Sequence, residues 1–175
     1  MNSLSALSVS IGVIAGLATF LAVGPLSGVF LIWAATISWA AYFALGGTDE
    51  AAKNTAVCSV FGVVVATYAA YEIATISPDT LLGFPMMAAV IVTFTVIAMC
   101  LAANIPALAA IPASVLGYSA TFGYLLQTPD KLSADVLLNL GWDNPICVIS
   151  FSLLLGVGLG IASAKLAAKL TTIEG

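Results

Sequence analysis

The polar side chains expected at membrane depth inside the apolar runs of this sequence are hydroxyls, aromatics and one amide. Thr36, Trp39 and Phe43 are spaced i, i+3, i+7, so they share one face of a helix. Tyr118 and Phe122 repeat the spacing of Trp39 and Phe43 in the second half of the chain. Such side chains offer hydrogen bonds and aromatic surface without charge, which suits a path for a small, mostly uncharged solute. We expect that path to be lined by Thr36, Trp39, Phe43, Asn104, Ser114, Tyr118, Thr121 and Phe122.

The ionisable residues of this sequence do not indicate a catalytic site. The chain has no histidine and no arginine, so a general base and a serine with a basic partner are missing, and we expect no enzyme activity. Cys58, Cys100 and Cys147 lie far apart in apolar runs, which predicts three buried thiols and neither a metal site nor a disulfide. The chain has four lysines and a net charge of −4, so we expect no nucleic-acid partner, and we expect no cofactor.

The composition predicts an all-α integral membrane protein whose partner is the lipid bilayer. Of the 175 residues, 62% are hydrophobic and 7% are charged, so nearly every helix-length window lacks a polar face. A crossing takes about 20 apolar residues, which leaves room for about six in one bundle spanning residues 1–175. Proline, glycine and charged residues divide the sequence into Leu4 to Val23, Leu26 to Leu45, Asn54 to Ile76, Leu81 to Ala103, Ala107 to Leu126, and Pro145 to Ala164.

The two halves of the chain, residues 4–76 and 81–170, resemble each other. The segment that begins at Ile32 aligns without gaps with the segment that begins at Ile111, which pairs Trp39 with Tyr118 and Phe43 with Phe122. Each half holds three predicted crossings, an odd number, so two repeats of this kind must be inverted in the membrane. We therefore predict two inverted three-helix repeats whose aromatic pairs face each other, with shared alanine and glycine content as the alternative explanation.

Small residues recur every four positions in three of the predicted helices. This small-xxx-small pattern lets helix backbones approach closely in lipid. It predicts helix packing faces, and flat faces suited to a homo-oligomer, through Gly12, Gly16, Gly62, Ala66, Gly156 and Gly160.

Charge in the predicted loops gives the orientation. With six crossings, both termini lie on one side together with Lys53, Lys165 and Lys169, and Lys131 alone lies opposite. The positive-inside rule then places the N-terminus and the C-terminus in the cytoplasm.

Three segments carry a resemblance to a known family: "SWAAYFALGG", "SVFGVVVATYAAY" and "IPASVLGYSATFG". Together they resemble the YcdZ-like family of small bacterial inner-membrane proteins, a domain of unknown function. The resemblance implies a compact multi-spanning protein of the bacterial inner membrane and assigns no substrate or catalytic residue. Pro112 and Ala113 depart from it, since a Pro-Gly turn would be expected there.

Three functions fit these observations. The first is a passive channel or facilitator for a small, mostly uncharged solute, such as a urea-like or amide-like molecule. The second is a non-transporting scaffold or accessory subunit, in which the aromatics and hydroxyls only pack. The third is a weakly cation-selective channel, which rests on acidic residues in the predicted outer loops, Asp79, Asp130, Asp135 and Asp143.

Overall fold

The computed structural model describes residues 1–77 and 79–171, and this part of the chain is helical without a strand. A short helix and two single 3-10 turns, η1 (Ala102–Asn104) and η2 (Pro106–Leu108), accompany six longer helices. The helices are α1 (Ser3–Val23), α2 (Ile32–Ala44), α3 (Asp49–Ala74), α4 (Gly83–Leu101), α5 (Ile111–Gln127), α6 (Ala134–Leu138) and α7 (Pro145–Leu170).

Within the described residues, four segments are long and apolar enough to cross a membrane: Ser3–Val23, Asp49–Ala74, Gly83–Asn104 and Pro145–Leu170. Helix α2 has 13 residues, which at 1.5 Å per residue is about 20 Å, short of a hydrocarbon core of about 30 Å. The prediction of an all-helical fold with helices suited to a membrane is thus confirmed. Six spans remain a prediction.

Two helices start later than the sequence predicts. The segment expected to be helical from Leu26 forms turns as far as Val29, with φ +81° at Gly28, and α2 begins at Ile32. In the second half, α5 begins at Ile111 rather than Ala107, which puts Pro112 in its first turn. A proline in the first turn of a helix needs no backbone N–H, so Pro112 starts α5 instead of kinking a longer helix.

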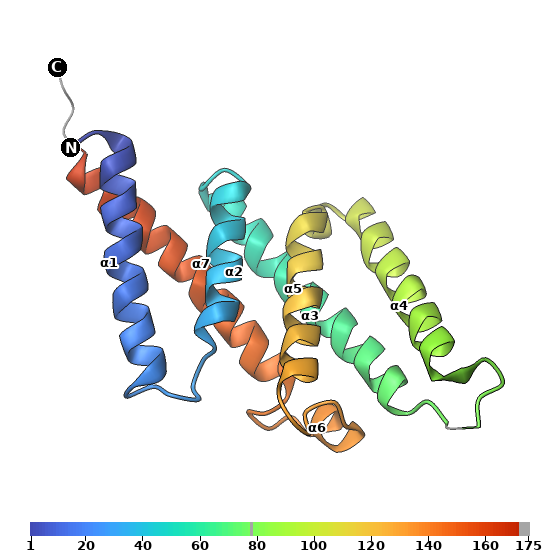
Figure 1. The fold of residues 1–175 in the computed structure, drawn as a ribbon. Coiled ribbons are helices and arrows are strands. Elements are labelled where there is room, and N and C mark those ends of the chain that lie inside the picture. The colour runs from blue at the N-terminus through green and yellow to red at the C-terminus, as the bar shows by residue number, and fades with distance from the viewer. Residues whose placement is uncertain (78, 172–175) are drawn as a thin grey trace.

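The helices form two layers (Figure 1). Helices α1, α2, α5 and α4 stand side by side in that order, and α7 and α3 run obliquely behind them. Helix α7 packs on α1 and α2, α3 packs on α5 and α4, and α3 and α7 contact each other. The N-terminus and the end of α7 lie at the same end of the molecule.

Glycines on the oblique helices set the closest crossings. A Cβ atom at Gly62 of α3 would overlap the Ser114 carbonyl of α5, and one at Gly156 of α7 would overlap the Ala35 carbonyl of α2. Gly160 lies against the aromatic rings of α2, because a Cβ atom there would overlap Tyr42 Cδ1 and crowd Trp39 Cδ1. Helix backbones therefore touch at Gly62 and Gly156, as small residues permit in lipid.

The other small residues predicted to form packing faces lie in different surroundings. Ala66 is fully buried in the cluster that holds Tyr118 and Met99. Gly12 and Gly16 of α1 have no described atom within 4 Å of a Cβ placed on them, so their face does not pack within the chain.

Asn144 fixes the loop between α5 and α7. It is fully buried, its Oδ1 accepts from the Ile146 N–H at 2.8 Å, and its Nδ2 donates to the carbonyls of Val136, Leu137 and Asn139 at 2.9–3.2 Å. One side chain thus caps α7 and ties α6 to its start.

We expect Asn144→Ala to lower the free energy of unfolding by about 2–3 kcal/mol, because it leaves buried backbone groups without partners. Thermal unfolding of the detergent-solubilised chain measures this. Asn139→Ala is the matched control, since the Asn139 side chain is exposed. Equal midpoints for the two variants would contradict the assignment.

Candidate functional site

A groove of about 250 Å³ runs between α1 and α2 and holds three of the predicted path residues. Its lining has no charged side chain and consists of Ile11, Ala15, Thr36, Trp39, Ala40 and Phe43. The residues from α2 lie at i, i+3, i+4 and i+7, one face of a helix. The groove therefore combines aromatic surface with a hydroxyl in an apolar surrounding.

Trp39 forms the fixed wall of this groove. Its side chain is 4% exposed, and its Nε1–H donates to Ser163 Oγ of α7 at 3.0 Å. The Ser10 hydroxyl of α1 donates to the Ser163 carbonyl at 2.6 Å. Three helices are thus joined around Trp39, and its indole N–H is already used.

Tyr118 and Phe122 of α5 lie against α3 and α4. Their rings lie 5.1 Å apart, and Tyr118 shares a 3.0 Å hydrogen bond with Thr95 of α4. Tyr118 also packs with Ala66 of α3 and Met99 of α4.

Trp39 and Phe43 therefore do not face Tyr118 and Phe122, as the sequence alignment predicted they would. In the described part of the chain no ring contact joins Trp39 or Phe43 to Tyr118 or Phe122. The reason is the crossing geometry: Trp39 lies on the face of α2 that meets Gly160 of α7, whereas the backbone at Tyr118 meets Gly62 of α3. Trp39 therefore packs on α7, whereas Tyr118 packs on α3 and α4.

Of the remaining predicted path residues, Thr36 lines the α1–α2 groove, and Asn104, Ser114 and Thr121 do not. Thr121 is fully buried and donates to the Gly117 carbonyl at 3.0 Å, and Asn104 in η1 donates to the Leu101 carbonyl at 2.8 Å. Ser114 is 2% exposed and its hydroxyl has no partner among the described residues. Thr36 in the groove donates to the Trp33 carbonyl at 2.8 Å.

The contact between α2 and α5 is apolar rather than lined by hydroxyls. Ala34 and Ile37 of α2 belong to the main core cluster together with Ala120 and Leu125 of α5. Ala15 and Ser163, which complete the groove and its fixed wall, were not singled out as path residues, because an alanine and a serine within apolar runs give no distinct sequence signal.

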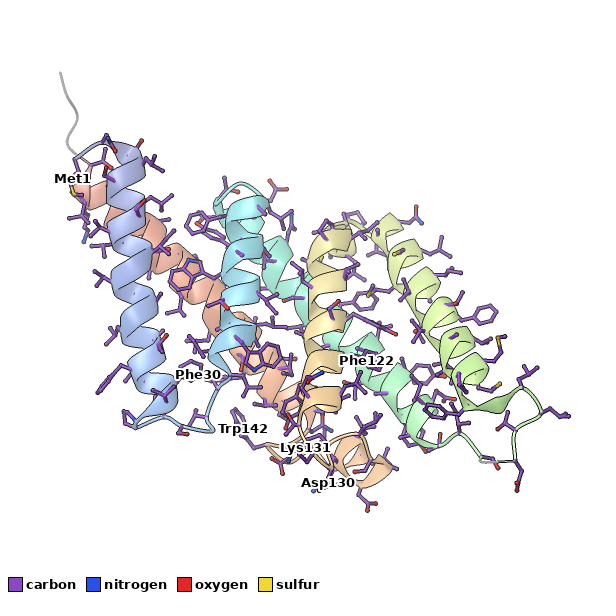
Figure 2. The ribbon with its side chains drawn as sticks, in the orientation of Figure 1. Met1, Phe30, Phe122, Asp130, Lys131 and Trp142 are labelled. Atoms are coloured by element: carbon purple, nitrogen blue, oxygen red, sulfur yellow. The ribbon has the colours of Figure 1, made fainter. Side chains whose placement is uncertain are left out.

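Polar groups gather at the end of the molecule opposite Met1, where Figure 2 shows Lys131 and Trp142. Lys131 Nζ lies 3.0 Å from Asp143 Oδ2, and this hydrogen bond raises the pKa of Lys131 above its ordinary value. Trp142 donates its Nε1–H to the Gly28 carbonyl at 3.0 Å. These contacts join the loop before α7 to the turns before α2.

The thiols and acids form no metal centre in the described residues, because no three His, Cys, Asp or Glu side chains are grouped suitably. All three cysteines are free. Cys58 is buried as predicted, whereas Cys100 and Cys147 are only half-buried.

The described fold places this chain in the class of all-helical proteins whose helices are long and apolar enough to cross a membrane. The chain belongs to the family described as "Protein of unknown function (DUF1097)", which matches residues 8–168. The family match agrees with the domain of unknown function expected from the sequence and leaves the YcdZ-like name as a prediction. Comparisons with curated proteins and with solved structures gave no match.

Proposed function

We propose that this protein is a passive facilitator for a small, mostly uncharged solute, with its path along the outer face of α2. The groove between α1 and α2 carries the proposal, since it brings Thr36, Trp39 and Phe43 together without a charged group. Aromatic and hydroxyl groups can replace part of the hydration of a neutral amide-like or urea-like solute. An ion would receive no compensating charge there. The proposal includes no catalytic step.

We also propose that the chain is two inverted three-helix repeats with six crossings. The support is that equivalent positions make equivalent contacts. Gly62 of the first half meets Ser114 of the second, and Gly156 of the second half meets Ala35 of the first, in agreement with the alignment of Ile32 with Ile111. Both Ile32 and Ile111 also begin a helix. Helices α2 and α5 would complete their crossings through the irregular segments that precede them, as in many transporters.

The location follows from the same proposal. The lysines at the start of α3 and the end of α7, Lys53, Lys165 and Lys169, belong to the end of the molecule that holds the N-terminus and the end of α7. The positive-inside rule would make this end cytoplasmic in a bacterial inner membrane.

A second copy of the chain would complete the path. The α1–α2 groove is open on its outer side, and lipid tails offer no hydrogen bonds to a polar solute. A homo-oligomer that covers this side would enclose Thr36 and Phe43. The unpacked face at Gly12 and Gly16 leaves α1 free for such a contact.

Thiol labelling tests the path. In a chain with its three cysteines replaced by alanine, we expect Thr36→Cys and Phe43→Cys in proteoliposomes to react with a water-soluble thiol reagent. Val13→Cys is the control, because Val13 is 60% exposed on the outer surface of α1, where lipid excludes the reagent. Labelling of Thr36→Cys and Phe43→Cys no faster than Val13→Cys would remove the support for a water-accessible path.

A scaffold or accessory subunit is the second candidate, and the use of the hydroxyls favours it. Ser38 donates to the Leu153 carbonyl of α7, and Thr121 and Thr67 donate to carbonyls of their own helices. The Ser38 hydroxyl thus joins two helices, and the Thr121 and Thr67 hydroxyls are used within their own helices, as expected for packing rather than for a path. The cation channel is weaker, since one of its acids, Asp143, is already paired with Lys131.

A further inference from the structure

A second hollow, of about 310 Å³, lies where the end of α5 meets the start of α2. It is lined by Trp33 in the first turn of α2 and by Gly123, Tyr124, Gln127 and Thr128 at the end of α5. We propose that this hollow binds a small, neutral, planar amide, stacked on Trp33 and hydrogen-bonded to Gln127.

Three of the residues that line this hollow carry polar groups without a partner among the described residues. In the described part of the chain, the Trp33 indole N–H, the Gln127 carboxamide and the Thr128 hydroxyl have no hydrogen-bond partner. Most hydroxyls within the helices differ, because they donate to carbonyls, as those of Ser38 and Thr121 do. The hollow thus offers free donors and one free amide acceptor side by side.

Glycine keeps the aromatic surface open. Trp33 is 40% exposed, and a Cβ atom placed on Gly123 would lie 3.9 Å from its Cη2 and 4.0 Å from its Cζ3. A larger side chain at Gly123 would therefore occupy the space beside the indole. Tyr124 is held in place on the other side, since it is 7% exposed and donates its hydroxyl to the Asp143 carbonyl at 3.1 Å.

Charge and shape select the ligand class. No charged side chain lines the hollow, and the neighbouring Lys131 and Asp143 neutralise each other at 3.0 Å. A primary amide can donate to and accept from the Gln127 carboxamide at once, and its planar group can stack on the Trp33 ring. An ion lacks a counter-charge here.

The hollow also lies beside the proposed path, because Trp33 and Thr36 are three residues apart on one face of α2. A role as the entrance of that path rests on the proposed function. Binding of the amide does not.

Saturation-transfer NMR with benzamide tests the site on the full chain in detergent micelles. We expect saturable binding to the unmodified chain, and about tenfold weaker binding after Gln127→Leu, which removes the amide hydrogen bonds. Gly123→Leu, which fills the hollow, is expected to weaken binding to a similar extent. The matched controls are Gly158→Leu, at a glycine with no described atom within 4 Å, and Leu126→Ala, at a residue that is 62% exposed.

The binding experiment tests the amide site independently of whether the protein transports a solute. Binding that is absent from the unmodified chain, or equal in Gln127→Leu, Gly123→Leu and the controls, would overturn the site, even if vesicles containing the protein transport amides. Binding that is lost only in Gln127→Leu and Gly123→Leu, while vesicles stay impermeable, would support the site and count against the proposed facilitator. A helical circular-dichroism spectrum equal to that of the unmodified chain shows that a variant has folded.

Discussion

Gly156→Ala is expected to disrupt the native packing of the chain, whereas Gly158→Ala, two residues later on the same helix, leaves it intact. A Cβ atom at Gly156 would overlap the Ala35 carbonyl and the Ser38 hydroxyl of α2, which are parts of a helix and cannot move aside independently. Overpacking of this kind costs about 3 kcal/mol or more. Gly158 has no described neighbour within 4 Å, so an alanine there costs nothing in packing.

The measurement is thermal unfolding followed by tryptophan fluorescence in detergent. We expect the midpoint of Gly156→Ala to fall by about 10 °C, or the variant to aggregate, and that of Gly158→Ala to stay near the unmodified value. Gly62→Ala should behave as Gly156→Ala does, because Gly62 meets the Ser114 carbonyl in the corresponding way. If Gly156→Ala and Gly158→Ala unfold at the same temperature, the described α2–α7 crossing is wrong.

Ala15→Phe is expected to abolish solute permeation through the protein. Ala15 lines the α1–α2 groove opposite the ring of Trp39, and a benzyl group there would occupy much of its volume of about 250 Å³. The wall behind it cannot retreat, since Trp39 is held by Ser163. We expect permeability to fall to that of protein-free vesicles.

Val13→Phe is the matched control for Ala15→Phe. It adds the same side chain to the same helix at a position that is 60% exposed, so the new ring extends into lipid. Permeability is measured as the swelling rate of proteoliposomes with equal protein content. Equal swelling rates for Ala15→Phe and Val13→Phe would exclude the α1–α2 groove as the path.

The sequence predicts long uninterrupted helices well and interrupted ones poorly. Helix α1 ends at Val23 and α7 starts at Pro145, as the apolar runs and prolines indicate. Helix α3 starts earlier than predicted, at Asp49, because Thr48 caps it by accepting from the Ala51 N–H. The late starts of α2 and α5 depend on turn geometry around Gly28 and Pro112, which an apolar run does not reveal.

Spacing also predicts which residues share a helix face but not what that face meets. Thr36, Trp39 and Phe43 do lie in one groove, as their spacing indicates. Their expected partners, Tyr118 and Phe122, lie against α3 and α4 instead, because the glycines of the oblique helices decide how α2 and α5 are turned. For the same reason the glycine pattern finds close contacts on α3 and α7, while Gly12 on α1 stays unpacked.

Stopped-flow swelling of proteoliposomes in urea, acetamide and glycerol gradients tests the proposed facilitator most directly. The account predicts that at least one of these neutral solutes enters faster than it enters protein-free vesicles, and that Ala15→Phe removes the difference. Entry at the rate of protein-free vesicles for all three solutes would contradict the account and favour a scaffold.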